Sequence, residues 1–154
     1  MEPKDTTGPT YFNSLYRHGV DEKRRLSIPA KWRPAEAGVE LTLVLWPKSK
    51  EGPCLRVLLP EQMAKLMRDI DATPNSETNK VVLKRFIGSQ SVQVALDKVG
   101  RVCLPDEMAK AAGITDEAVL VGLLDRYEIW SPARYEMVKA SDAVMAAEAF
   151  KLME

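Results

Sequence analysis

Residues 20–29 read VDEKRRLSIP, and residues 96–105 read LDKVGRVCLP. In both stretches an apolar residue is followed by Asp, three variable positions, Arg, an apolar pair separated by one residue, and Pro. Three members recur at one offset of 76 residues, as Asp21, Arg25 and Pro29 in the first copy and Asp97, Arg101 and Pro105 in the second. An internal repeat of this kind predicts two equivalent halves, each presenting the same charged turn.

The composition is that of a globular protein with an uneven charge distribution. Of its 154 residues, 45% are hydrophobic and 29% are charged, and the net charge is zero. Residues 17–33 carry six bases and two acids, and residues 80–101 carry five bases and one acid, a net +4 in each case. Residues 102–154 hold ten acids and five bases, a net charge of −5. Positive charge around both copies of the repeat favours a nucleic-acid partner, with a plain solvated surface as the alternative.

The hydrophobic pattern predicts a similar series of strands in each half. Strands are expected at residues 11–20, 26–28, 39–46 and 54–59, and again at 91–96, 102–104, 118–124 and 127–130. The Asp-to-Arg segments between the first two strands of each half are expected to be hairpin turns. Gly100 would supply the positive φ that a tight turn requires. The segment from Lys48 to Pro53 is expected to be an exposed loop.

Helices are expected after the strands. Pro29 and Pro105 suit the first position of short helices, and Gly113 suits the C-cap of the second one. Leu59-Pro60 and Ser131-Pro132 predict the starts of two longer helices, and Thr73-Pro74 the start of a third that ends near Gly88. An apolar stripe predicts that the first longer helix packs on the core, through Met63, Leu66, Met67 and Ile70.

Residues with catalytic or metal-binding chemistry are few. His18 is the only histidine, and the sequence has neither a GxGxxG motif nor a phosphate-binding loop. Cys54 and Cys103 lie in apolar stretches without CxxC spacing, so both are expected to be buried, reduced thiols of a cytoplasmic protein. We therefore expect no enzyme activity, no catalytic or metal site, no cofactor and no small-molecule substrate. The polar start, residues 1–10, and the absence of an apolar run of roughly 20 residues argue against a membrane segment.

The repeated turn is the candidate functional site. Arg25 and Arg101 could contact phosphates or read guanine in the major groove, and Lys23 and Lys98 would add salt-dependent attraction. Asp21 and Asp97 could accept hydrogen bonds from turn amides or fix the angle of the guanidinium. The alternative is that each Asp–Arg pair only staples its hairpin. Two copies in basic segments favour DNA binding.

These residues resemble the MraZ family of bacterial transcriptional regulators. In the first half the resemblance rests on DEKRRLSIP (residues 21–29), on GPCL (52–55) and on Leu59-Pro60. In the second half it rests on four stretches: LKRFIG (83–88), LDKVGR (96–101), VLVG (119–122) and YEIW (127–130). The family resemblance extends from about Tyr16 to Tyr135.

The resemblance implies an α+β fold with a β-rich core built from two tandem AbrB-like, swapped-hairpin half-motifs and flanking helices. The implied divisions are a flexible tail (1–10), the first repeat (11–72), a bridging helix (73–90), the second repeat (91–139) and a C-terminal helical tail (140–154). It also implies ring-like homo-oligomers. These would bind double-stranded DNA at short promoter direct repeats and regulate the division and cell-wall gene cluster in the cytoplasm, on the nucleoid.

By resemblance, the DNA-binding residues are Lys23, Arg24, Arg25, Lys98 and Arg101, and the loop-orienting residues are Asp21, Asp97 and Gly100. One position departs from the family pattern, because Arg24 stands where the first loop usually has glycine. If the turn needs positive φ there, arginine incurs a steric penalty of about 1–2 kcal/mol, or the turn changes shape. An AbrB-like antitoxin and a non-specific nucleoid scaffold remain alternative functions.

Overall fold

The computed structural model describes residues 11–47 and 50–154. Its eight strands are β1 (Leu15–Gly19), β2 (Arg25–Ser27), β3 (Glu40–Trp46), β4 (Cys54–Leu58), β5 (Ser91–Ala95), β6 (Arg101–Cys103), β7 (Glu117–Gly122) and β8 (Tyr127–Trp130) among the described residues. Its helices there are η1 (Ala30–Trp32), α1 (Pro60–Ala72), α2 (Glu77–Ser89), α3 (Asp106–Ala111), α4 (Pro132–Phe150) and η2 (Lys151–Met153). A β-rich core with flanking helices confirms the predicted α+β class.

The strands of the two halves are interleaved. Six of them form one sheet in the order β1-β7-β8-β4-β3-β5, with antiparallel pairs throughout. β1 of the first half pairs with β7 of the second, and β5 of the second half pairs with β3 of the first. Neither half therefore completes its sheet without the other.

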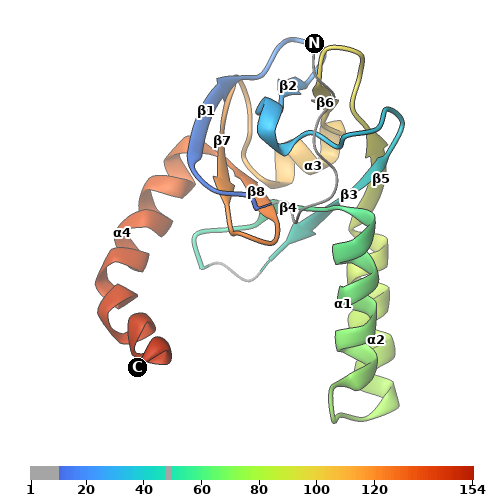
Figure 1. Ribbon diagram of the computed structural model, residues 1–154, viewed down its shortest axis with the longest axis vertical. Coiled ribbons are helices and arrows are strands. Elements are labelled where there is room, and N and C mark those ends of the chain that lie inside the picture. Colours follow the sequence, from blue (N-terminus) through green and yellow to red (C-terminus); the bar gives the residue numbers. More distant parts are fainter. Residues whose placement is uncertain (1–10, 48–49) are drawn as a thin grey trace.

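The remaining two strands form a separate ribbon that carries the repeated turns. β2 pairs with β6 in antiparallel register, with Leu26 opposite Val102. Both of these side chains are buried, at 0% and 1% exposure. Successive side chains of a strand point to opposite faces, and the middle residue of each short strand points inward. The ribbon lies at the end of the molecule opposite the free ends of the α1–α2 hairpin and of α4 (Figure 1).

An aromatic group joins the ribbon to the sheet. Trp32 follows β2 and packs against Tyr127 of β8 and Phe12, with ring centroids 4.8 and 6.0 Å away. All three are almost fully buried. Aromatic contacts of this kind add to the hydrophobic stabilisation of the core. The ribbon that carries the turns therefore packs on a well-packed core.

The helices flank this core. α1 and α2 run side by side as a projecting hairpin, and α4 leaves the sheet on the other side (Figure 1). Ile70 of α1 and Ile87 of α2 are buried against Val44 and Leu58 of the sheet. Val138 of α4 packs near Trp130. No helix within residues 11–47 and 50–154 is long and apolar enough to cross a membrane.

Most of the predicted strands are found within one or two residues of their expected bounds. The largest difference is at 11–20, where regular structure covers only Leu15–Gly19 and the flanking Phe12 and Val20 make isolated bridges. Ser14 has a φ of +83°, which interrupts the strand before it reaches Phe12. The predicted tail 1–10 and residues 48–49 of the predicted loop lie outside the described residues.

The helix predictions need three corrections. Pro29 and Pro105 are N-caps, one position before the first helical residue. The helix predicted from Thr73-Pro74 begins at Glu77, because the Ser76 hydroxyl accepts the Asn79 amide hydrogen bond as an N-cap. Met67 is 44% exposed although it belongs to the predicted apolar stripe of α1. Ile70 of that stripe is buried, whereas Met63 and Leu66 are only partly buried.

Candidate nucleic-acid interface

The first Asp-to-Arg segment is a closed turn organised by one carboxylate. Asp21 Oδ1 accepts hydrogen bonds from the backbone amides of Lys23 and Arg25, both at 2.9 Å. Asp21 Oδ2 accepts a hydrogen bond from Arg25 Nε at 2.7 Å. The aspartate therefore does both things expected of it, because it satisfies turn amides and also fixes the guanidinium.

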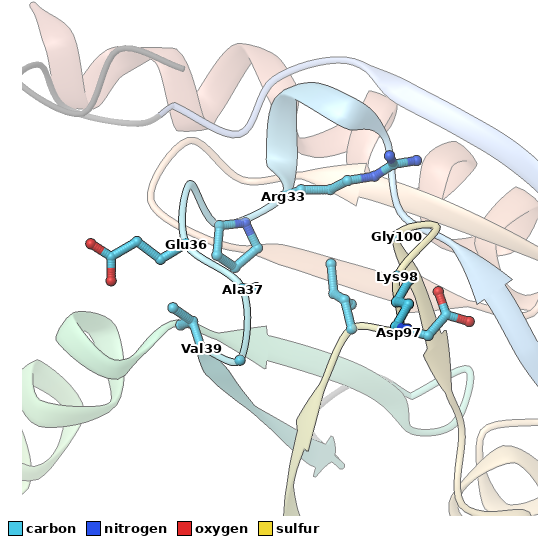
Figure 2. A pocket seen from close by; sticks show the side chains of 10 residues that line it. Arg33, Glu36, Ala37, Val39, Asp97, Lys98 and Gly100 are labelled. Carbon is cyan, nitrogen blue, oxygen red and sulfur yellow. The ribbon is translucent and has the colours of Figure 1, made fainter. Parts of the chain in front are cut away.

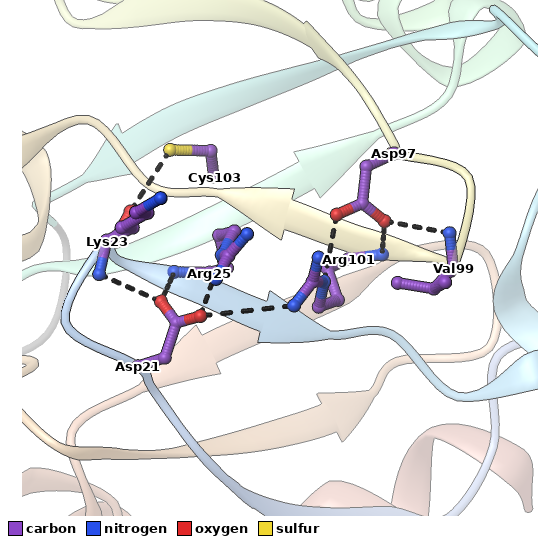
Figure 3. Close-up of polar contacts among 7 residues, drawn as sticks. All are labelled: Asp21, Lys23, Arg25, Asp97, Val99, Arg101 and Cys103. Carbon is purple, nitrogen blue, oxygen red and sulfur yellow. Dashed lines mark hydrogen bonds and ion pairs between the residues drawn. The ribbon is translucent and has the colours of Figure 1, made fainter.

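The second segment repeats this geometry (Figure 3). Asp97 Oδ1 accepts from the amides of Val99 and Arg101 at 3.0 and 2.9 Å, and Oδ2 accepts from Arg101 Nε at 2.8 Å. Gly100 has a φ of +82°, as predicted for this turn. Two stretches 76 residues apart thus build the same local structure.

The ribbon carries the two turns at its opposite ends, because β2 and β6 run antiparallel and each turn leads into the start of its own strand (Figure 3). Arg25 lies opposite Cys103, and Ser27 lies opposite Arg101. These residues alternate with the buried pair at the centre of the ribbon, so they share its outward face. Arg101 Nη1 stands 4.0 Å from Asp21 Oδ2, which links the second turn to the first (Figure 3).

Neither loop arginine uses its terminal amino groups in a hydrogen bond among the described residues, although Arg101 Nη1 also forms the 4.0 Å ion pair with Asp21. Arg25 and Arg101 donate to their aspartates through Nε, and their side chains are 33% and 32% exposed. Two parallel N–H donors held at a fixed angle match a phosphate, or the O6 and N7 atoms of guanine.

The aspartates remain ionised under ordinary conditions. Hydrogen bonds from the Arg25 amide, together with the Arg25 guanidinium and the Lys23 amide, lower the pKa of Asp21. The Arg101 amide, its guanidinium and the Val99 amide lower the pKa of Asp97 in the same way. Ionised carboxylates make the stronger, charge-assisted hydrogen bonds, which favours a fixed arginine.

The two loop lysines are exposed beside these arginines. Lys23 lies two residues before Arg25, and Lys98 lies three residues before Arg101. In residues 11–47 and 50–154, neither ammonium group has a hydrogen-bond or ion-pair partner. Free, exposed ammonium groups next to oriented guanidinium groups form a surface suited to a polyanion.

Arg24 adopts the backbone conformation that the family pattern assigns to glycine. Its φ is +64°, so the turn keeps the shape of the second loop and accepts the steric penalty. Its side chain turns toward α3, where Nε donates to Asp106 Oδ1 at 2.9 Å. Sequence reasoning missed this partner, because Asp106 lies 82 residues away.

The prediction of two buried cysteines is half wrong. Cys54 is 2% exposed, and burial raises the pKa of its thiol. Cys103 is exposed on the ribbon, where its Sγ lies 3.4 Å from the Lys23 carbonyl oxygen. Val102 and Leu104 point inward, so the alternation of a strand turns Cys103 outward. This period-two pattern was available in the sequence.

An open pocket of about 290 Å³ lies beside the second loop and combines residues from both halves. The 33–39 segment forms one wall, and residues 96–100 form the other (Figure 2). Arg33 lies against Gly100 in this pocket (Figure 2), a contact that the sequence did not suggest.

His18 stacks on Tyr16 with their ring centroids 6.2 Å apart. Among the described residues no cluster of potential metal ligands exists.

The fold and the paired loops define a β-rich protein with a basic, repeated surface, and its relatives are transcriptional regulators. Residues 87–151 match the family model described as "MraZ protein, putative antitoxin-like". The chain is 33% identical over 145 residues to "Transcriptional regulator MraZ" of Roseiflexus castenholzii, covering 93% of this chain and 97% of that protein. The chain belongs to the MraZ family of transcriptional regulators.

Two further relatives have the same name. "Transcriptional regulator MraZ" of Parvibaculum lavamentivorans is 33% identical over 126 residues, covering 80% of this chain and 78% of the relative. "Transcriptional regulator MraZ" of Rickettsia felis is 34% identical over 139 residues, covering 89% and 92% respectively. Membership of this regulator family confirms the expectation that the protein is not an enzyme.

Proposed function

We propose that this regulator binds double-stranded DNA in a sequence-specific manner through its two Asp-x-x-x-Arg loops. The observation that carries the proposal is the identical Asp–Arg hydrogen-bond set of two loops that lie at the two ends of one short ribbon. Arg25 and Arg101 are the base-reading or phosphate-binding groups. Lys23 and Lys98 add electrostatic attraction, and the anchored Arg24 contributes its charge.

The proposed target is a set of short direct repeats in the promoter of the division and cell-wall gene cluster. One chain offers only two short loops, a small footprint for tight binding. Several chains engaging successive repeats would gain affinity through high effective concentration. Action at such a promoter places the protein in the cytoplasm, on the nucleoid.

Assembly into a ring-like homo-oligomer is part of the same proposal. Two helices leave apolar side chains uncovered within a single chain. On α2 these are Val82, Leu83 and Phe86, and on α4 they are Met137, Val144 and Met145, all between 45% and 84% exposed. Apolar faces of this kind commonly mark contacts with other protein surfaces. Sedimentation at micromolar concentration should show a species well above 17.2 kDa.

A fluorescence-anisotropy titration tests the DNA-binding proposal. Wild-type protein should bind a duplex of G-rich direct repeats more tightly than a scrambled duplex of equal length at the same salt concentration. Equal affinity for the two duplexes would support a non-specific nucleoid scaffold instead. A protein that binds neither duplex would refute DNA binding through the loops.

An antitoxin is a second candidate, favoured by the exposed apolar side chains along α4 and by the wording of the matching family model. In that case the segment after Trp130 would cover a toxin. α4 is a continuous helix from Pro132 to Phe150, whereas the antitoxin alternative assumes an arm that orders on its partner. Co-purification of a small toxin that releases DNA would favour this candidate over the regulator.

A further inference from the structure

Each loop is held in place at one equivalent backbone position. In the first loop the carbonyl of Arg24 accepts a hydrogen bond from the Leu104 amide at 2.9 Å. In the second loop the carbonyl of Gly100 accepts one from the Ile28 amide at 3.0 Å. Arg24 and Gly100 are 76 positions apart, the offset of the repeat, and both have positive φ.

A guanidinium group lies beside each of these positions, but it comes from a different residue. In the first loop it belongs to Arg24 itself, which reaches Asp106 Oδ1 at 2.9 Å and the Ile114 carbonyl at 3.5 Å. In the second loop it belongs to Arg33, which follows η1 and donates from Nε to the Ile28 carbonyl at 2.8 Å. Arg24 thus ties the first loop to α3, whereas Arg33 lies over Gly100 and bonds to Ile28, the residue whose amide holds the second loop.

The second arrangement requires glycine in the loop. A Cβ placed on Gly100 would lie 2.2 Å from Arg33 Nε and 2.3 Å from its Cζ. The Arg33 side chain therefore occupies the space that any side chain at position 100 would need (Figure 2). An arginine at position 33 and a side chain at position 100 exclude one another.

The equivalent positions of the first loop, found with the repeat offset, have the opposite arrangement of large and small residues. The counterpart of Arg33 is Ala109, which stands four residues after Pro105 as Arg33 stands four residues after Pro29. Ala109 is completely buried and has no long side chain to lie over the first loop. The position of Gly100 is filled there by Arg24. In the first loop the arginine is therefore at position 24, and position 109 is alanine.

We propose that Arg24 and Arg33 are equivalent positioning residues, and that Arg24 replaces an arginine at position 109. Each one holds its loop in the conformation that aims Arg25 or Arg101 outward. The inference rests on the proposed DNA-binding function for its consequence, but the positioning itself is a property of the free protein. The guanidinium can come from either position as long as the other is glycine or alanine.

A double-mutant cycle tests whether an arginine at position 109 can take the place of Arg24. Its four proteins are the wild type, Arg24→Gly, Ala109→Arg and the double variant. Arg24→Gly removes the anchor to Asp106, so amide hydrogen exchange at Lys23 and Arg25 should accelerate about tenfold. The double variant should restore slow exchange, because Nε of an arginine at position 109 would reach the Leu104 carbonyl, the counterpart of Ile28. Exchange at Val99 and Arg101 is the internal control and should not change.

DNA affinity is measured in the same cycle, at a temperature where all four proteins are folded. Arg24→Gly should raise Kd roughly threefold to tenfold, because a mobile loop must be ordered on binding, and the double variant should restore it. Unchanged exchange in Arg24→Gly, or a double variant as mobile as Arg24→Gly, would overturn the inference. If the wild type binds no DNA, the proposed function fails. The amide hydrogen-exchange rates still test whether Arg24 positions the first loop.

The second loop supplies an independent test. Gly100→Ala in the wild type should displace Arg33 and accelerate exchange at Val99 and Arg101. In an Arg33→Ala background the same Gly100→Ala change should have a smaller effect, because the guanidinium it would meet is absent. Equal effects in the two backgrounds would contradict the proposed exclusion between positions 33 and 100.

Discussion

Arg101 lies between two carboxylates that belong to different repeats. Its Nε donates to Asp97 Oδ2 at 2.8 Å, and its Nη1 stands 4.0 Å from Asp21 Oδ2. Asp21 also accepts the hydrogen bond from Arg25 Nε at 2.7 Å. The two loops are therefore linked electrostatically at Asp21. The link is asymmetric because Asp97 forms no ion pair with Arg25 among the described residues.

This asymmetry predicts unequal effects of two matched substitutions. Asp21→Ala should weaken DNA binding about twofold to fivefold more than Asp97→Ala, because Asp21 orients both arginines and an exposed ion pair contributes up to about 1 kcal/mol. Both variants remove one negative charge, so the general electrostatic effect cancels in the comparison. Anisotropy titrations at one salt concentration measure the difference, and a larger loss in Asp97→Ala would contradict it.

Binding should weaken steeply as salt concentration rises. Each phosphate neutralised by a loop cation contributes about −0.9 to the slope of log K against log salt. Lys23→Gln and Lys98→Gln should each flatten the slope by about that amount, since both ammonium groups are exposed and unpaired among the described residues. Lys65→Gln is the control, because Lys65 lies on α1 and pairs with Asp69. A wild-type slope near zero would exclude phosphate contact.

Modification of Cys103 should block DNA binding. Its thiol is exposed on the outward face of the ribbon, opposite Arg25, whereas Cys54 is buried. N-ethylmaleimide should label one cysteine in the native protein, and the bulky adduct should obstruct the surface between the loops. Cys103→Ser should bind DNA normally and resist the reagent. A fully labelled wild type with unchanged affinity would mean that DNA binds elsewhere.

The loop aspartates predict how the site responds to acid. Their pKa values are lowered from 3.8, so both carboxylates should titrate below that value in a ¹³C NMR titration. A folded pKa below the unfolded one means that the stabilisation is present above the unfolded pKa, about 3.9, and is lost as pH falls through the folded pKa. These groups should therefore not alter DNA affinity between about pH 5 and pH 8. A midpoint above 3.8 for either aspartate would contradict the hydrogen-bond geometry.

Local features of the fold were predictable from sequence. The Asp-to-Arg turns and the positive φ at Gly100 follow from short-range chemistry, and both are found. The prediction of hairpins was wrong, because the strands that flank each turn pair with other strands. Gly113 has a φ of +71° but follows the C-cap, Ala112, by one residue. For Arg24 the sequence left two outcomes open, a positive φ or a turn of different shape, and the structure has the positive φ. Turn and cap geometry depends on a few neighbouring residues, which explains why a single sequence suffices.

Contacts between the halves were not predictable. The alternation of β1 marks an inward face, but it does not specify that β7, about 100 residues away, will be its partner. The contacts of Arg24 with Asp106 and of Arg33 with Gly100 depend on that interleaving. Cys103 is a different case, because its neighbours Val102 and Leu104 already indicated an outward side chain.

The most direct test of the account is the effect of removing both loop arginines. Arg25→Ala/Arg101→Ala should lose about 1–3 kcal/mol of affinity per arginine on the direct-repeat duplex, and less on a scrambled duplex. Its melting temperature should stay within a few degrees of the wild type, since both side chains lie on the exposed face of the ribbon. Arg17→Ala, a surface arginine on β1 paired with Glu117, is the matched control and should retain affinity. Full affinity in a folded double variant would contradict DNA binding through the loops.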